Sequence, residues 1–175
     1  GPPNLAAALA AAGFEEDGPE TFLVLDMAAT LAAFDPPAGI EVREVTDRAG
    51  AADLVAVSEA AFGRNEPWRL DQLVGRLDDP TQALFVAYDG GAPVSSGRLE
   101  LAPGKTFAGL YGGGTRPDYQ GRGVYRALVA ARAAVARRRG HRYLTVDARE
   151  TSRPILQRIG FEPLTTIRDW TLAAT

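Results

Sequence analysis

Apolar and polar positions along the chain predict alternating helices and strands with one clear break. Residues 4–12 are strong helix formers behind an asparagine, and a glycine follows them. The β-rich segment Thr21–Met27 predicts a strand. The Pro- and Gly-containing run 35–39 interrupts every regular pattern. We therefore expect an N-terminal helix–strand appendage over residues 1–35 and a main domain over residues 40–175.

The main domain is predicted to contain a strand and two helices, then three strands, then helices alternating with strands. Leu84–Tyr88 is a continuous apolar run, which is typical of a central strand covered on both faces. Apolar residues recur at helical spacing along 123–139, the clearest helix of the chain. The expected strands are 40–45, 84–88, 94–101, 107–115, 143–147 and 164–172, and the expected helices are 53–62, 68–77, 123–139 and 152–159.

This order of elements predicts the fold class. Three consecutive strands joined by short turns form an antiparallel meander, and the later strand–helix–strand connections are crossovers that add parallel neighbours. We therefore expect an α+β layered domain with a mixed, mostly antiparallel central sheet and helices on both faces.

Composition and charge narrow the classes of function. The chain has 175 residues, 46% of them hydrophobic, which is enough for one domain with a core. Its formal net charge of -3 gives no electrostatic reason to expect nucleic acid as a partner. It contains no run of eighteen apolar residues, so we expect no membrane span and a cytoplasmic location. The lack of cysteine excludes disulfides and thiolate ligands, and a single histidine argues against a metal centre or a Ser-His-Asp triad.

Glycines concentrate between the predicted strand 107–115 and the helix that follows it. The sequence there reads Gly112-Gly113-Gly114-Thr115-Arg116-Pro117-Asp118-Tyr119-Gln120-Gly121-Arg122-Gly123-Val124-Tyr125. The first N–H groups of a helix have no partner within it, and the helix dipole adds positive charge there, which suits a pyrophosphate. The junction is neither a Walker loop nor a G-x-G-x-x-G dinucleotide motif. A glycine-rich turn that binds nothing is the alternative.

The chain resembles the core of the GNAT superfamily of N-acetyltransferases over about residues 40–175. The resemblance rests on Gln120-x-x-Gly123, the amphipathic helix, a short strand, a second short helix and Gly160-Phe161. It implies acetyl-CoA as cosubstrate, with its pyrophosphate held by Gln120, Gly121, Arg122, Gly123, Val124 and Tyr125. It also implies a V-shaped gap between strands 107–115 and 143–147, where the backbone of Gly113 and Thr115 pairs with the pantetheine arm.

Three departures from the family pattern concern the site. Tyr125 stands where the family usually has Gly or Ala, and Arg149 stands where many members have an Asn that contacts CoA. Leu156 occupies the position of the Tyr that often protonates the departing thiolate. Either another hydroxyl takes over, with Ser152 the nearest in sequence, or the thiolate leaves unassisted, which a thiol pKa of roughly 8.5 to 10 permits.

An amine nucleophile must lose a proton, so a general base is useful. Glu100 is the first candidate, and an ion pair with Arg98 is the alternative role for it. Asp147 is the second candidate, with a turn or cap role as the alternative.

The resemblance implies that an acyl group moves from acyl-CoA to an amine by direct attack. The alternatives are a catalytically silent CoA-binding or regulatory module with the same fold, and an interaction domain without a ligand. The expected partner is a small-molecule or peptide amine, without nucleic acid or membrane. A homodimer is compatible with the sequence, and no metal is implied.

The N-terminal appendage repeats a pattern found near the C-terminus. Leu9–Glu15 and Leu156–Glu162 share the form L-x-x-x-G-F-E, and each lies between a predicted helix and a predicted strand. Chance in an alanine-rich chain is one explanation, and residues 1–27 as the tail of a missing upstream half is the other. The family has two strands after Phe161 and only one is predicted here. We therefore expect Thr21–Met27 to fill the vacant place, packed with its own helix against the C-terminal edge of the sheet.

Overall fold

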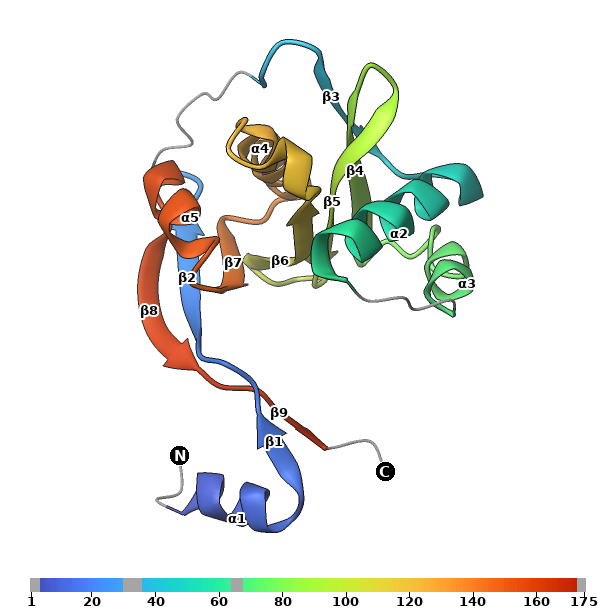
Figure 1. Cartoon of the computed structure of the whole chain (residues 1–175). Helices are drawn as coiled ribbons and strands as arrows, with labels where there is room; N and C mark the ends of the chain where they lie inside the picture. Colours follow the sequence, from blue (N-terminus) through green and yellow to red (C-terminus); the bar gives the residue numbers. More distant parts are fainter. Residues whose placement is uncertain (1–3, 30–35, 64–67, 173–175) are drawn as a thin grey trace.

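The computed structural model describes residues 4–29, 36–63 and 68–172, and Figure 1 shows a layered body from which a narrow arm projects. The elements are α1 (Leu5–Ala11), β1 (Phe14–Glu16), β2 (Glu20–Asp26), β3 (Ile40–Glu44), α2 (Arg48–Phe62), α3 (Arg69–Val74), β4 (Gln82–Asp89), β5 (Ala92–Leu101), β6 (Phe107–Thr115), the short 3-10 helix η1 (Pro117–Tyr119), α4 (Val124–Arg138), β7 (Tyr143–Ala148), α5 (Arg153–Ile159), β8 (Glu162–Ile167) and β9 (Trp170–Leu172).

Seven strands form the central sheet in the order β3-β4-β5-β6-β7-β2-β8, and β1 pairs with β9 in a separate two-stranded sheet. Within the central sheet every neighbouring pair is antiparallel except β6 and β7, which are parallel. The mixed, mostly antiparallel sheet expected from the order of elements is therefore confirmed.

Helices cover both faces of the sheet, and the alternation along β4 shows why. Leu84, Val86 and Tyr88 pack in one apolar cluster with residues of α2 and α3. Phe85 packs in a different cluster, which contains the apolar residues of α4. In Figure 1, α2 accordingly lies on one side of the sheet and α4 on the other. The continuous apolar run of β4 thus marks a central strand covered on both faces, as expected.

β2 enters the sheet between β7 and β8, although it comes from the other end of the chain. It is antiparallel to both neighbours, and its Leu23 and Leu25 are buried in the main core. The prediction that Thr21–Met27 joins the sheet is confirmed. Two parts of that prediction are wrong, because β8 rather than β2 forms the edge, and α1 packs beside β1 without burying any of its residues.

Three local expectations are also corrected. The segment after Phe161 forms two strands, β8 and β9, rather than one, and β1 was not expected at all. The short strands β1 and β9 pair with each other, so neither is specified by its own sequence alone. α2 begins at Arg48, five residues earlier than expected, because the side chain of Asp47 accepts a hydrogen bond from the N–H of Gly50 at 2.8 Å.

Candidate functional site

β6 and β7 pair for only three residues each and then separate. The paired residues are Phe107–Gly109 in β6 and Tyr143–Thr145 in β7. Beyond them, β6 continues along β5 only, and β7 continues along β2. The separation lies where the resemblance placed a V-shaped gap, and it leaves main-chain groups of β6 turned toward a strand that is no longer beside them.

A β-bulge interrupts β6 at its glycines. Ser96 of β5 pairs with Gly114 and Arg98 pairs with Tyr111, so Gly112 and Gly113 both stand opposite Gly97. Gly112 has φ +56°, a left-handed conformation that side chains disfavour. A bulge releases backbone groups from the ladder and turns them outward. The glycine-rich sequence therefore builds a kink on the strand that borders the gap.

The space beneath this bulge is filled by two side chains of α4. A Cβ at Gly113 would lie 3.0 Å from Cε2 of Tyr125. A Cβ at Gly97 would lie 2.8 Å from Nη1 of Arg132. Gly97 and Gly113 therefore allow close packing, whereas Gly112 allows the backbone conformation of the bulge. They also explain how the chain accommodates Tyr125 where a small residue was expected, because the ring occupies the room that Gly113 leaves.

Arg132 is fully buried, at 0% exposure, although it carries a charge. Its Nε donates to the carbonyl of Leu128 at 3.2 Å and its Nη1 donates to the carbonyl of Arg98 at 3.3 Å. Burial lowers the pKa of this guanidinium below its usual range. Within the described part of the chain Nη2 has no hydrogen-bond acceptor. Arg132 thus joins α4 to the bulge and places its Nη2 next to Gly113, beside the hydroxyl of Tyr125.

The loop between β6 and α4 has the geometry of an anion site. Gly121 has φ +75° and Gly123, the N-cap of α4, has φ +81°. Gly123 has no side chain to cap the helix, so the N-terminal N–H groups of this 15-residue helix point into the loop. Val124 is buried against the core and anchors the first turn. Gln120, Gly121 and Arg122 are exposed at the mouth of the loop.

Side chains around this loop hold its shape. Thr115 is buried, and its Oγ1 lies 2.8 Å from Oγ of Ser95. Nε2 of Gln120 donates to the carbonyl of Thr115 at 3.4 Å, which ties the loop to the end of β6. The guanidinium of Arg122 lies 4.8 Å from the ring centre of Tyr119. The predicted cofactor residues from Gly113 to Tyr125 therefore lie on one continuous stretch of β6, η1 and α4, with Gln120, Gly121 and Arg122 exposed.

Tyr111 stands among charged groups on the bulged strand, and sequence reasoning missed it. Burial raises the pKa of its phenol, and the nearby carboxylates of Glu100 and Asp147 raise it further. Its ring lies over Gly109, where a Cβ would come within 2.5 Å of Cε2. The guanidinium of Arg98 is 5.4 Å from the ring centre. A lone phenol two positions after a glycine in a glycine-rich strand was the signal available in the sequence.

The two predicted carboxylates approach the same phenol and differ in their own partners. Glu100 forms an ion pair with Arg98 at 2.7 Å, which is the alternative role considered for it. Burial raises the pKa of Asp147, and the carboxylates of Glu20 and Asp169 raise it further. Oδ1 of Asp147 is buried without a hydrogen-bond partner among the described residues. Asp147 is therefore the carboxylate with the greater tendency to hold a proton.

The hydroxyl proposed to replace the missing tyrosine has a local partner. Ser152, the N-cap residue of α5, donates its Oγ proton to the carbonyl of Arg149 at 3.2 Å. Leu156, at the position of the family tyrosine, is fully buried in the main core. The helix position that usually faces the thiolate thus contributes to packing in this chain.

An aromatic side chain from α2 borders the bulge on the other face of the sheet. A Cβ at Gly114 would lie 2.8 Å from Cβ of Ala61 and 2.9 Å from Cε2 of Phe62. Phe62 is exposed at the end of α2. The end of α2 therefore rests on the bulged strand and offers an exposed aromatic ring beside Gly114.

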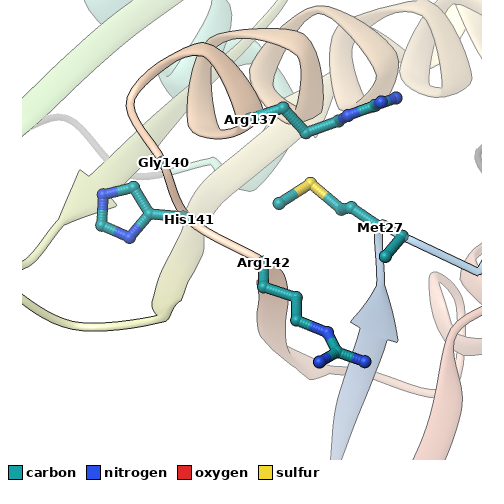
Figure 2. Close-up of a pocket in the computed structure, with 6 residues that line it drawn as sticks. Met27, Arg137, Gly140, His141 and Arg142 are labelled. Atoms are coloured by element: carbon teal, nitrogen blue, oxygen red, sulfur yellow. The ribbon is translucent and has the colours of Figure 1, made fainter.

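The hollow drawn in Figure 2 lies at the opposite end of α4. It has a volume of about 260 Å³ and is lined by Met27, Ala28, Arg137, Gly140, His141 and Arg142. Arg142 is held by Asp26 at 2.7 Å and lowers the pKa of that carboxyl. Gly123 is the N-cap at the other end of the same helix. This hollow is therefore distinct from the loop at Gly123 and does not take its place as the candidate site.

Comparisons with known proteins agree with this geometry. The model of the acetyltransferase (GNAT) family matches residues 47–161. A GCN5-related N-acetyltransferase from Sphaerobacter thermophilus has a similar structure, with a TM-score of 0.69 and 22% identity over 94% of this chain and 55% of that one. A second from Kribbella flavida has a TM-score of 0.63 and 19% identity over 94% and 62%. No curated protein matches the chain in sequence.

A third similar structure is AAC(6')-Iy in complex with the bisubstrate analogue CoA-S-monomethyl-acetylneamine. Its TM-score is 0.62 at 19% identity, covering 70% of this chain and 90% of that one. The chain spans only 55 to 64% of the length of the first three structures that it matches. None of the helices in the described part of the chain has both the length and the apolar composition needed to cross a bilayer.

Proposed function

Because the chain belongs to the GNAT family of acetyltransferases, we propose that it transfers an acyl group from acyl-CoA, in the first place acetyl-CoA, to an amine. One observation carries this proposal. A strand that separates from its parallel neighbour, a glycine bulge on that strand and an uncapped helix N-terminus follow one another within residues 107–125. A thioester, its pantetheine arm and its pyrophosphate require these three features in the same order.

The cofactor residues act mainly through their backbone. The N–H groups of Gly121–Tyr125 bind the pyrophosphate oxygens, with the helix dipole adding positive charge. The exposed guanidinium of Arg122 adds a charge-assisted contact, and Gln120 keeps the loop attached to Thr115. The main chain of Gly113 and Thr115 pairs with the pantetheine amides along the side of β6 that β7 has left.

The reaction needs one bond to form and one to break. The amine nitrogen attacks the thioester carbonyl, the C–N bond forms, and the C–S bond breaks as the thiolate leaves. A backbone N–H released at the bulge of β6 polarises the carbonyl oxygen as it becomes negative. The proton lost by the amine goes to a base, and the thiolate takes a proton from an acid or from water.

We assign the base to Asp147 ahead of Glu100. The raised pKa of Asp147 makes its carboxylate the better proton acceptor, whereas Glu100 is neutralised by Arg98. Tyr111 is the preferred acid, because it lies on β6 just beyond the residues that pair with β7 and a phenol is protonated at neutral pH. Ser152 is the second choice, since its hydroxyl already donates to a carbonyl.

The acceptor is an amine that is a small molecule or the end of a peptide. Arg149 pairs with Glu20 at 3.0 Å, so Asp169 and the proposed base Asp147 supply the negative charge that favours a cationic amine. The analogue bound to AAC(6')-Iy, in which CoA is joined to acetylneamine, supports this class of acceptor by similarity of fold. We expect the reaction to take place in the cytoplasm. A homodimer is compatible with this proposal.

Calorimetric titration of the protein with acetyl-CoA tests the cofactor site, with ATP and NAD as controls. We expect selective binding in the micromolar range. Gly123→Leu should abolish it, because the residue at φ +81° must hold the loop open. Gly140→Leu is the matched control, since Gly140 follows the same helix at φ +84° and lies away from the loop. Equal losses in both variants would contradict the assignment.

Turnover separates an enzyme from a silent CoA-binding module. Thiol release from acetyl-CoA is followed with a panel of amines, including aminoglycosides, amino acids and peptides. Asp147→Asn should lower kcat by roughly 100-fold while the affinity for acetyl-CoA is unchanged. Binding without turnover on any amine would favour the silent module.

A further inference from the structure

The two-stranded sheet repeats the pairing of the last two strands of the central sheet. Glu15 of β1 and Glu162 of β8 are 147 positions apart (162 minus 15), and so are Val24 of β2 and Thr171 of β9. In the central sheet Val24 pairs with Glu162. In the two-stranded sheet Thr171 pairs with Glu15. The two pairs are therefore equivalent.

The next pair along each sheet follows the same rule. Leu23 pairs with Pro163 in the central sheet, and Trp170 pairs with Glu16 in the two-stranded sheet. Residues 23 and 170 are again 147 positions apart, as are residues 16 and 163. A chance similarity between two short sequences predicts no such agreement of register. The segments α1–β1–β2 and α5–β8–β9 are therefore two copies of one unit, and each copy places its second strand beside the first strand of the other.

The two copies differ in what covers them. Leu156 and Phe161 of the second copy are buried in the main core, whereas their counterparts Leu9 and Phe14 are only half-buried. Leu25 of β2 is 3% exposed, and its counterpart Leu172 of β9 is 58% exposed. Apolar residues at equivalent positions thus have a core in one copy and none in the other.

We propose that α1, β1 and β9 complete a second acetyltransferase-type sheet, which belongs to a domain that precedes them in the same polypeptide. β2 lies between β8 and β7. Among the described strands, β9 has β1 on one side only. By the equivalence of the copies, the other side of β9 takes an antiparallel strand that corresponds to β7. A helix corresponding to α4 then covers Leu9, Phe14 and Leu172.

A second copy of this chain does not meet the requirement. Its β7 already pairs with its own β2, from Thr21 opposite Ala148 to Asp26 opposite Tyr143, so it cannot place that strand beside β9. The lengths of similar structures agree with a further domain beside this one. The two GCN5-related N-acetyltransferases match 94% of this chain, and this chain spans only 55 and 62% of their length. AAC(6')-Iy is matched over 90% of its own length, and that match leaves out 30% of this chain.

Hydrogen exchange tests the proposal on two polypeptides, the 175-residue chain and the same chain extended by the residues that its gene encodes before Gly1. In the 175-residue chain we expect the amides of Trp170–Leu172 to exchange ~100-fold faster than those of Leu23–Leu25. In the extended polypeptide the two sets should be protected to a similar degree. A gene that encodes no upstream domain, or β9 protection unchanged by the extension, overturns the proposal.

Protein concentration distinguishes the other occupant. Should the protection of β9 in the 175-residue chain rise with concentration as a dimer appears, the occupant is a second copy and the proposal is wrong.

Engineered cysteines check the register, since the chain has none of its own. Glu15→Cys with Thr171→Cys should form an intramolecular disulfide, and Glu15→Cys with Trp170→Cys should not, because adjacent residues face opposite sides. The reverse result removes the equivalence on which the proposal rests.

Discussion

The two helix–glycine–strand units of this chain have the same local structure in opposite surroundings. α1 and α5 are both seven residues long, and each is followed by a glycine with positive φ, Gly13 at +85° and Gly160 at +111°. The phenylalanine after the glycine is half-buried in the first unit and 2% exposed in the second. The same helix and helix-ending glycine therefore occur in both surroundings, whereas the strand partner and the surrounding core come from the rest of the fold.

This difference in burial predicts which of the two units contributes to the free energy of unfolding of the whole domain. In a cooperative domain, the loss of a buried side chain lowers the free energy of unfolding of the whole, whereas a segment with few buried contacts opens by itself. The two units allow this contrast to be measured at matched positions, with the same residue types in both.

The largest effect is expected at the two phenylalanines. Phe161→Ala should lower the free energy of unfolding by about 3–5 kcal/mol, because it removes a ring from the main core. Phe14→Ala should lower it by less than about 1 kcal/mol, since its ring is only half-buried. Urea denaturation followed by circular dichroism measures both. Equal losses would show that α1 and β1 are an integral part of the cooperative domain.

A smaller effect is expected at the two glycines. Gly160→Ala should cost roughly 1–2 kcal/mol of global stability, because alanine disfavours a positive φ. Gly13→Ala imposes a similar local strain but should leave the urea midpoint unchanged and instead speed amide exchange in α1. A shift of the midpoint by Gly13→Ala would mean that the first unit unfolds together with the core.

The smallest effect concerns two acidic groups of neighbouring strands, Asp26 at the end of β2 and Asp147 in β7. The folded pKa of Asp147 is raised, so deprotonation is harder in the folded state and stability should fall as pH rises from about 4 through that pKa. Asp147→Asn should therefore stabilise the protein slightly at pH 7 relative to pH 3. Asp26→Asn is the opposite control, because Arg142 lowers the pKa of Asp26 and its contribution is lost as pH falls. Urea titrations at the two pH values check both signs.

The sequence predicts most of the elements because their periodicity is strong and local. The apolar run of β4 and the apolar face of α4 specify a strand covered on both faces and an amphipathic helix. β1 was missed, and β9 was not separated from β8, because β1 and β9 are three residues long and each gains its only described partner from the far end of the chain. The position of β2 at the inside of the sheet likewise depends on contacts with residues more than a hundred positions away.

The candidate site was predictable in its backbone and less so in its side chains. Glycines at 112, 121 and 123 are a signal that the sequence states directly, since positive φ at each position requires them. The roles of Glu100 and Tyr111 depend instead on which neighbours the sheet places beside them. Arg98 pairs with the first, and burial and two carboxylates act on the second.

The insertion of β2 between β7 and β8 has a consequence for synthesis. β2 leaves the ribosome roughly 120 residues before β7 begins, which at about 5–20 residues per second is a delay of the order of 10 s. During that time Phe22-Leu23-Val24-Leu25 is an unpaired apolar strand with both edges open, the kind of segment that aggregates. Glu20 and Asp26 flank it with negative charge, which opposes association between nascent chains until the sheet can receive it.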